Sequence, residues 1–365
     1  MRGNIGTLFA VTLIAIVMIF TPGCSSKPGT TGPALKVDSF TVAQGLPGNH
    51  ITALAVFGSQ IWVGTKNGLA RHDGVNWQVH VKKNTNALGS EVIEALAVGD
   101  NTIYIATENG VTKFDGTTWG TIMTGVRARG VAAKGNEIAV ATAHGVEYST
   151  GAEFQPFGKE NAGLCFGEVN TVVFDTQKRL WAGTRAGLGL FSGGAFQNQT
   201  GPAKSVMGNS LVNVPASPLS CQLPGNNILC MLPWKGQMAL GTTSGFALSD
   251  LDKSWSVFTA AHKDWVQKAG SIVEEMTSGN SPMPGNAVTA LAAMGDTILF
   301  VGTNKGVVAK SDASWIDLQS AIPALSGKAI TALATEKDAL WAGTSDALYK
   351  IDGISSLVNQ SAGSK

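Results

Sequence analysis

The sequence carries little charge, and its positive and negative residues are balanced. Asp, Glu, Lys and Arg make up 14% of the 365 residues, and the formal net charge is +1. A nucleic-acid-binding protein would show a basic stripe, which this chain lacks. It also lacks the acidic or basic tails that indicate a charged polymer as partner. The composition therefore predicts no nucleic-acid partner.

Motifs that carry chemistry are missing as well. The sequence has no His-Glu-x-x-His, no Gly-x-Ser-x-Gly, no phosphate-binding Gly-rich loop ending in Lys-Ser/Thr, and no Cys-x-x-Cys. We therefore predict no catalytic residue, no metal site and no cofactor.

The apolar run near the N-terminus is too short for a permanent membrane anchor. Leu8 to Phe20 has 13 residues and would rise ~20 Å as a helix, whereas the hydrocarbon core is about 30 Å thick. With Arg2 before it and a break at Thr21-Pro22 after it, the run has the form of a signal peptide over residues 1–23.

The end of this segment, Gly23-Cys24, resembles the lipobox of bacterial lipoproteins. The resemblance implies that Cys24 becomes the lipidated N-terminus, and that Ser25 directs the protein to the outer membrane, facing the periplasm or exposed at the surface. Simple secretion is the alternative. Residues 24–35 are rich in Ser, Gly, Pro and Thr and read as a flexible tether.

What the sequence does contain is a repeated phrase. Trp-x-Gly-Thr-x-x-Gly-Leu occurs at residues 62–69 and 181–188, and at 341–348 with Ala in place of the second Gly. Four weaker copies end in Thr107, Thr142, Thr242 and Thr303. The Thr residues recur about every 40 residues, with two longer spacings, which is the period of a propeller blade or of a helical repeat pair.

The residues around the phrase indicate strands. Before it lies a short apolar run such as Ile51 to Val56, and after it come a strand closed by Asp-Gly and a strand with an aromatic residue such as Trp77. The inner runs show little alternation of polarity, so both faces must be covered by neighbours. We predict a seven-bladed β-propeller of four-stranded antiparallel blades over residues 36–358. A sandwich or open solenoid would leave sheet edges exposed.

Ring closure requires one strand from the other end of the chain. Residues 37–42 precede the first inner strand, and Phe40 stands where other blades carry their Trp. We predict that this segment supplies the outer strand of the last blade. Ile354 to Val358 is the competing candidate, and residues 359–365 are predicted to be a disordered tail.

Three cysteines remain in an exported protein once Cys24 is assigned to lipid. Cys230 occupies an inner-strand position where other repeats have Ala, which predicts a buried side chain. Cys165 and Cys221 each precede an inner strand of neighbouring blades, so we predict a disulfide between them. Three free thiols are the alternative.

Two units carry insertions, at about residues 198–222 and 259–287, both between an outer strand and the next inner strand. In the second, apolar residues at helical spacing predict an amphipathic helix over His262 to Thr277. It would either pack outside blades five and six or cover the channel mouth.

Connections into the inner strands share one rim with the turns between second and third strands. Polar side chains converging there from several blades could form a binding site. Many are plain turn residues, but Arg127, Arg185 and Glu168 are not explained in that way. The predicted ligand or partner contacts are His50, Lys66, Glu91, Glu108, Arg127, His144, Glu168, Arg185, Lys305 and, on the insertion, Trp265.

The inner strand, the Trp-x-Gly-Thr-x-x-Gly-Leu phrase and the Asp-Gly turn together resemble the two-component regulator propeller repeats. That resemblance implies a sensing propeller outside the cytoplasm, here in a free-standing lipoprotein without a kinase segment. We expect a monomeric, non-enzymatic envelope protein that binds an unidentified envelope protein or small ligand, in a sensory or scaffold role. A propeller enzyme, a lyase or a glycan-active enzyme with its active site at the channel mouth, is the second hypothesis.

Overall fold

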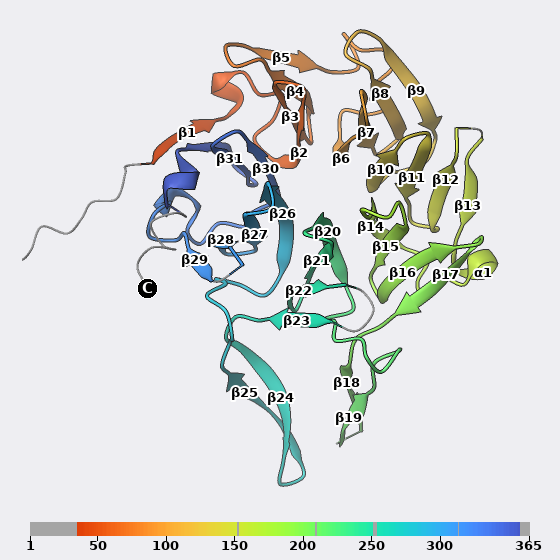
Figure 1. Ribbon diagram of the computed structural model, residues 1–365, viewed down its shortest axis with the longest axis vertical. Coiled ribbons are helices and arrows are strands. Elements are labelled where there is room, and N and C mark those ends of the chain that lie inside the picture. The colour runs from red at the N-terminus through yellow and green to blue at the C-terminus, as the bar shows by residue number, and fades with distance from the viewer. Residues whose placement is uncertain (1–34, 152, 209, 251–253, 313, 358–365) are drawn as a thin grey trace, which may run out of the picture. The chain divides into compact units, whose positions relative to one another are not determined.

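The computed structural model describes residues 35–151, 153–208, 210–250, 254–312 and 314–357. The predicted signal peptide, Cys24, nearly all of the tether and the tail lie outside these ranges. The described chain forms a ring of seven four-stranded antiparallel sheets (Figure 1), so the predicted propeller is confirmed. None of the helices in the described ranges is long and apolar enough to cross a bilayer.

The first four blades follow one another along the chain, and the strands of each run in order from the channel to the outer edge. Blade 1 comprises β2 (Ile51–Phe57), β3 (Gln60–Thr65), β4 (Gly68–His72) and β5 (Trp77–His80). Blade 2 comprises β6 (Ile93–Val98), β7 (Ile103–Thr107), β8 (Gly110–Phe114) and β9 (Trp119–Thr124). Blade 3 comprises β10 (Gly130–Lys134), β11 (Glu137–Ala141), β12 (Val146–Ser149) and β13 (Gln155–Phe157). Blade 4 comprises β14 (Val169–Phe174), β15 (Leu180–Thr184), β16 (Gly187–Ser192) and β17 (Ala195–Gln199).

The second half of the ring follows the same order, and the last blade takes its outer strand from the start of the chain. Blade 5 comprises β20 (Ile228–Trp234), β21 (Gln237–Thr242), β22 (Gly245–Ser249) and β23 (Trp255–Phe258). Blade 6 comprises β26 (Val288–Met294), β27 (Ile298–Thr303), β28 (Gly306–Lys310) and β29 (Trp315–Asp317). Blade 7 comprises β30 (Ala332–Glu336), β31 (Ala339–Gly343), β32 (Leu348–Asp352) and β1 (Lys36–Phe40). The short helices include η1 (Val42–Gln44), α1 (Lys159–Ala162) and η2 (Pro323–Leu325), and residues 354–357 are also helical.

The Gly-Thr phrase forms the joint between neighbouring blades. A Cβ placed on Gly64 would lie 2.6 Å from Cγ2 of Ile93, the first inner-strand residue of the next blade. A larger residue would not fit at this position, because the next blade packs directly against the glycine. The threonine closes the turn that follows: Thr65 Oγ1 donates to the carbonyl of Gly68 at 2.8 Å and accepts from the Asn67 N–H at 3.0 Å.

The backbone carbonyl of the equivalent threonine in other blades links neighbouring blades directly. The Val169 N–H donates to the Thr142 carbonyl, and the Ile51 N–H donates to the Thr344 carbonyl at 3.0 Å. The second of these bonds joins blade 7 to blade 1 across the closure. The repeated phrase is thus an inter-blade contact, which explains why the sequence keeps it at blade spacing.

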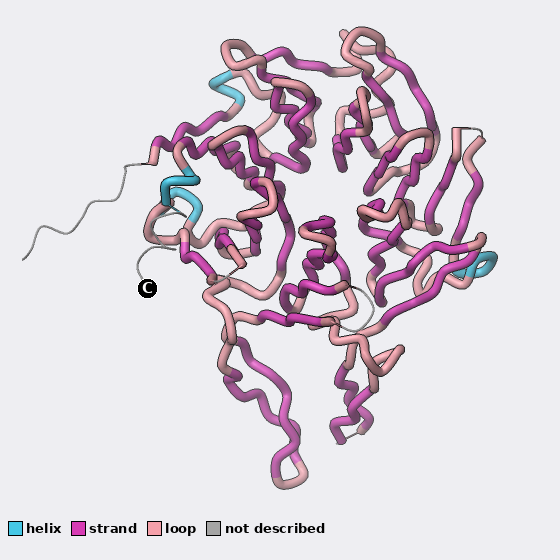
Figure 2. The backbone as a smooth tube through the Cα atoms, in the orientation of Figure 1, coloured by secondary structure: helices cyan, strands magenta, loops and turns pink. Residues whose placement is uncertain are grey.

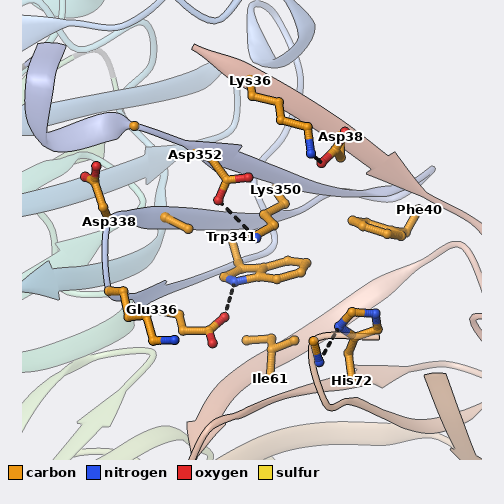
Figure 3. Close-up of a pocket in the computed structure, with 14 residues that line it drawn as sticks. Lys36, Asp38, Phe40, Ile61, His72, Glu336, Asp338, Trp341, Lys350 and Asp352 are labelled. Carbon is orange, nitrogen blue, oxygen red and sulfur yellow. Dashed lines mark hydrogen bonds and ion pairs between the residues drawn. The ribbon is translucent and has the colours of Figure 1, made fainter. Parts of the chain in front are cut away.

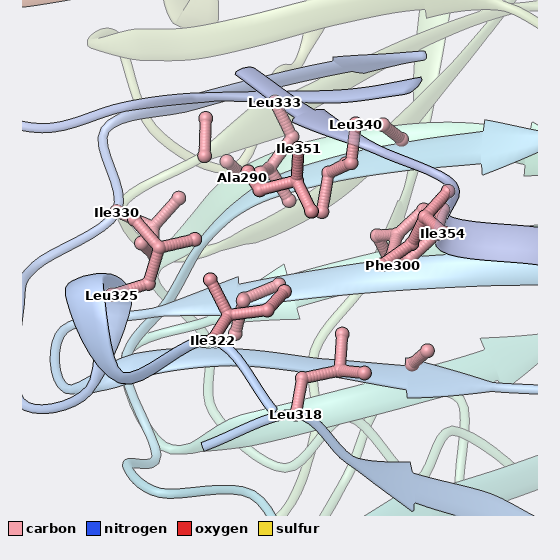
Figure 4. Close-up of a cluster of buried hydrophobic side chains, with 14 of the residues drawn as sticks. Ala290, Phe300, Leu318, Ile322, Leu325, Ile330, Leu333, Leu340, Ile351 and Ile354 are labelled. Carbon is pink, nitrogen blue, oxygen red and sulfur yellow. The ribbon is translucent and has the colours of Figure 1, made fainter. Parts of the chain in front are cut away.

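The core consists of seven apolar clusters, each formed between two neighbouring blades. Figure 4 shows the cluster between blades 6 and 7, to which Phe300, Leu333, Leu340 and Ile351 belong. A single blade has no core of its own, because both of its faces are needed by its neighbours.

The strand that closes the ring is the predicted one, but its register differs from the prediction. β1 pairs with β32 from Lys36 opposite Asp352 to Phe40 opposite Leu348. Trp77 of blade 1 lies opposite the last residue of its neighbouring strand, His72, so Phe40 does not occupy the Trp position. Its ring instead packs against Trp77 at 5.5 Å and Trp341 at 5.8 Å. The competing segment does not add a strand, because residues 354–357 are helical.

The predicted helix over His262 to Thr277 is wrong. These residues form a hairpin of β24 (His262–Lys268) and β25 (Ser271–Thr277). Its two-residue turn, Ala269-Gly270, has φ of 45° and 84°, the positive pair that such a hairpin requires. Spacings of three and four residues arise here from opposite strands of a ribbon, and the β-branched residues Val266, Ile272 and Val273 favour strand over helix.

The first insertion also forms a hairpin, of β18 (Ala203–Met207) and β19 (Ser210–Val214). The two hairpins contact each other: Lys204 pairs with Asp264, and the Leu211 N–H donates to Gln267 Oε1 at 2.8 Å. Both leave the ring next to blade 5 and point away from its centre (Figures 1 and 2). The second insertion therefore neither packs along the outside of blades five and six as a helix nor covers the channel.

A buried histidine makes the stability of the ring depend on pH. His80 stacks on Trp62 and lies 4.9 Å from the Trp119 ring. Burial lowers the pKa of its imidazole to about 4, and the charge of Arg71 adds to the effect. The unfolded chain binds this proton below about pH 6.5, while the folded ring does so only near pH 4. The contribution of His80 to the unfolding free energy is thus fully present above pH 6.5. It falls as the pH drops toward 4, by up to roughly 3 kcal/mol.

We expect His80→Phe to flatten the fall in unfolding free energy between about pH 6.5 and pH 4, measured by urea unfolding at a series of pH values. His144→Phe, at an exposed turn position, serves as the control and should keep the steep dependence. Parallel curves for wild type and His80→Phe would contradict the assignment.

Candidate functional site

The inner strands line a cavity of about 500 Å³ that follows the channel past blades 2, 3, 4 and 5. Each inner strand pairs with only one neighbour in its sheet, so its other edge faces the channel without a strand partner, although some of its carbonyls, such as that of Ile228, accept from side chains of a neighbouring blade. The cavity wall between its two ends is built of small and apolar residues, including Ala95, Val131 and Met231. Lys134 lies at one end of the cavity, and Glu94, Arg129 and Asn170 lie at the opposite end, where the inner strands begin.

At that end, six charged side chains from blades 2, 3 and 4 form what we term the mouth cluster: Glu94, Glu108, Arg127, Arg129, Glu168 and Arg185. Arg127 donates from Nε and Nη2 to Glu94 Oε1, at 3.1 and 2.7 Å. Arg129 pairs with one oxygen of Glu168, and Arg185 Nη1 donates to the other at 3.0 Å. The loop from residue 127 to 129 joins the two halves of the cluster.

The backbone fixes this loop between two blades. The Ala128 N–H donates to the Thr107 carbonyl of blade 2 at 3.0 Å, and the Arg129 N–H donates to the Ala141 carbonyl of blade 3 at 2.9 Å. Ala128 itself is fully buried. Arg127 and Arg129 are therefore presented from an anchored segment.

Two residues at the mouth owe their position to a β-bulge. The pairing of β6 with β7 shifts between Ile93 and Ala95, and that of β14 with β15 shifts between Val169 and Thr171. A bulge re-aims the extra residue, here Glu94 and Asn170, which both line the cavity. Asn170 donates to the Ile228 carbonyl at 2.8 Å and to Asn227 Oδ1 at 3.1 Å, which links blades 4 and 5.

The electrostatics of the cluster keep its central carboxylate ionised. The hydrogen bond from Arg185, and then the hydrogen bond and charge of Arg129, lower the pKa of Glu168. Elsewhere on the rim, burial and the charge of Lys66 lower the pKa of His50. The mouth is thus an ion-pair network at neutral pH.

The structure brings together four of the predicted residues and leaves the others apart. Glu108, Arg127, Glu168 and Arg185 belong to the mouth cluster. The other five rim candidates are turn or connection residues that make no ion pair with the cluster within the described chain: His50, Lys66, Glu91, His144 and Lys305. Trp265 lies on β24, 47% exposed, on the hairpin that points away from the ring.

Sequence reasoning missed Glu94 and Arg129. The signal for Glu94 was available, since the second position of the inner run is Thr in Ile51-Thr52-Ala53 and Ile330-Thr331-Ala332 but Glu in Ile93-Glu94-Ala95. A charge inside an otherwise apolar strand marks a side chain that leaves the core. Arg129 had no comparable signal, because its position depends on the path of the inter-blade loop.

The predicted disulfide does not form in the structure, where Cys165, Cys221 and Cys230 are free thiols. Cys165 Sγ lies 3.4 Å from Thr184 Oγ1 beneath the turn of its own blade. Cys221 instead packs into the apolar cluster between blades 4 and 5. Cys230 lies on inner strand β20, as predicted, with Sγ 3.5 Å from the Val288 carbonyl.

A second cavity, of about 570 Å³, lies at the closure between blades 7 and 1 (Figure 3). Four of its charged groups form two ion pairs: Lys36 pairs with Asp38 at 2.6 Å, and Lys350 pairs with Asp352 at 3.0 Å. Glu336 accepts from Trp341 Nε1 at 3.2 Å. Each ion pair lies within a single strand, β1 or β32, and the two strands are joined by their backbone pairing from Lys36–Asp352 to Phe40–Leu348.

No protein-family model matches the sequence, and no curated protein matches it either. Solved structures do match the fold. The extracellular domain of a B. thetaiotaomicron protein, described both as a one-component and as a hybrid two-component system, superposes with a TM-score of 0.61 at 15 to 16% identity. The match covers 86 to 87% of this chain, which spans 39% of the length of that domain.

Two further likenesses cover nearly the whole of the other chain. Virginiamycin B lyase from Staphylococcus aureus, with quinupristin bound, has a TM-score of 0.58 at 10% identity over 87% of this chain and 99% of its own. YCF48 bound to D1 peptide has a TM-score of 0.55 at 15% identity over 88% and 99%. At these identities the likeness is one of fold, so the chain shares its propeller with extracellular domains of two-component system proteins and with lyases.

Proposed function

We propose that this protein is a non-enzymatic binding module of the bacterial envelope, held to the outer membrane by a lipid on Cys24, that recognises a ligand or partner protein through the mouth cluster. The observation that carries the proposal is the convergence of charged side chains from three blades at the open end of a cavity of about 500 Å³. Rigid strands position these side chains, and free backbone edges line the space behind them.

The comparisons support a role outside the cytoplasm without specifying it. The B. thetaiotaomicron neighbours are extracellular domains, and the signal-peptide and lipobox pattern of this sequence is consistent with export. YCF48 binds a peptide on a similar ring. A sensory module would bind a small ligand, whereas a scaffold would bind another envelope protein, and both uses require the same exposed mouth.

The enzyme hypothesis has support only from the lyase fold. A general acid or base requires a carboxyl or imidazole whose pKa lies near the working pH. Glu168 instead has its pKa lowered by two arginines, and no histidine contacts the mouth cluster within the residues that the structure describes. The arrangement therefore favours recognition over proton transfer.

We expect the double variant Arg127→Gln, Arg185→Gln to reduce capture of the partner at least tenfold while the melting temperature changes little. Both side chains are about half exposed, and exposed ion pairs contribute about 0 to 1 kcal/mol. Capture is measured by quantitative pull-down of the lipidated protein from intact envelopes, and ligand binding by thermal shift.

The matched control is Lys66→Gln, Lys305→Gln, which removes two positive charges from other sectors of the same rim. It should leave capture intact. Equal losses in both double variants would indicate a general charge effect and would contradict recognition at the mouth cluster.

A further inference from the structure

The arginines of the mouth cluster have more N–H donors than the glutamates use. A guanidinium carries donors on all three nitrogens in a planar fork and has no acceptor. Arg127 directs both of its hydrogen bonds to a single oxygen of Glu94, and Arg185 bonds Glu168 through Nη1. Arg129 Nε is buried and has no hydrogen-bond partner.

The six side chains of the cluster are formally neutral in sum, but their close contacts are unevenly shared. The three arginines make their short ion pairs with only two of the three carboxylates, Glu94 and Glu168. Glu108, the third acid, comes no nearer to Arg127 than 3.9 Å, which is beyond hydrogen-bond distance. Both oxygens of Glu168 are already occupied by Arg129 and Arg185. An additional oxyanion at the mouth could thus accept from arginine N–H groups that the glutamates leave unused.

The cavity behind the cluster limits what such an anion can be attached to. Arg129 and Glu94 lie at its entrance, and the wall beyond them includes Gly130, Ala132 and Val172. The positive charge at the far end, Lys134, already donates to the Asp175 carbonyl at 2.8 Å. A narrow, uncharged body would therefore fit inside, and its acidic group would remain at the arginines.

Building on the proposed function, we propose that the mouth cluster binds the terminal carboxylate of a ligand whose extended, uncharged body enters the channel, with Arg129 and Arg185 as the principal contacts. Carboxylate suits the planar, two-pronged donors of arginine. The free edges of the inner strands would bind a ligand body that carries amide groups, whereas the alanine and valine side chains would bind an acyl chain.

The test compares two sources of this chemistry by titration calorimetry on the full mature protein. One arm uses a pool of N-acetylated tripeptides with a free C-terminal carboxylate, and the other a series of linear alkanoates. Each acid is compared with its amide, a peptide amide in the first arm and an alkanamide in the second, which lacks the negative charge. We expect at least one arm to bind as acids, with the amides weaker by roughly tenfold to a hundredfold.

Three variants locate the binding. In Arg129→Gln, the affinity for the acid should fall to that for the amide. In Arg129→Lys, the affinity should lie between those of Arg129→Gln and wild type, because the charge remains but the two-pronged donor is lost. Arg71→Gln is the control, since Arg71 lies on β4 and bonds Gln78 away from the mouth. Thermal unfolding confirms that each variant is folded.

Acids that bind no better than amides, or binding that survives Arg129→Gln, would overturn this inference. Suppose that neither the peptides nor the alkanoates bind, but that the double variant Arg127→Gln, Arg185→Gln captures less of the envelope partner. Recognition at the mouth cluster then stands, and the carboxylate assignment is wrong. If that partner capture is also unaffected, the proposed function falls as well.

Discussion

A chain that begins at Val42 instead of Ser25 is expected to lose the cooperative unfolding of the ring. The shorter chain lacks β1, and the five residue pairs from Lys36–Asp352 to Phe40–Leu348 go with it. β32 then becomes an exposed edge strand, which is a template for aggregation. Loss of Phe40 also removes the ring that packs between Trp77 and Trp341.

The expected size of this effect is large because closure couples all of the blades. Phe40→Ala alone should cost roughly 3 kcal/mol, at the lower end for a large aromatic residue because Phe40 is only half-buried. Val37→Ala is the matched control on the same strand, where Val37 is 37% exposed, and should cost less than about 1 kcal/mol. Both are measured by chemical unfolding monitored by tryptophan fluorescence.

Adding the missing strand as a separate peptide distinguishes the loss of ring closure from a general effect of shortening the chain. A synthetic peptide of residues 35–41 should raise the melting temperature of the shortened chain, and the same peptide with Phe40→Ala should do so less. If the shortened chain unfolds with the same midpoint and cooperativity as the longer one, β1 does not contribute to closing the ring.

Replacing the glycine of the Gly-Thr phrase is expected to separate blades 1 and 2. In Gly64→Ala, the new Cβ would lie 2.6 Å from Ile93 Cγ2 and 3.0 Å from Ile93 Cβ. Ile93 is fully buried and cannot move aside without displacing the inner strand of blade 2. Overpacking of this kind costs about 1 to 3 kcal/mol, and Gly64→Val should cost more.

A double-mutant cycle identifies the contact. Ile93→Ala alone should cost roughly 2 to 5 kcal/mol because it leaves a cavity. The double variant Gly64→Ala, Ile93→Ala should cost less than the sum, since the new methyl group partly fills the space. Gly167→Ala is the control, because its nearest neighbour would be 3.7 Å away. Strict additivity would contradict the assignment of Gly64 to the inter-blade joint.

The outcome for the two insertions shows where sequence patterns are ambiguous. Both insertions were located correctly from the irregular spacing of the Thr residues, because the blades around them keep their length. Their conformation was not, since apolar residues of a hairpin can repeat at helical intervals when a two-residue turn joins its strands. The positive φ of Ala269 and Gly270 was the missing information, and Ala at such a position gives no sequence signal.

The candidate site was predicted in part for a similar reason. Arg127, Arg185 and Glu168 stood out because they occupy connections where turn-forming residues are usual. Which carboxylate each arginine meets depends on how neighbouring blades are rotated. His144 and Lys305 occupy comparable turns in other blades but make no ion pair with the cluster, and the difference is not visible along the chain.

The sequence by itself determined the ring, the number of blades, the closing strand and the positions of the two insertions. It could do so because a propeller repeats one local contact, in which a glycine makes room for the first inner-strand residue of the next blade. The tertiary structure alone decided the register of Phe40, the hairpin form of the second insertion and the partners within the mouth cluster. These depend on distances between residues far apart in sequence, and no local pattern of residues encodes them.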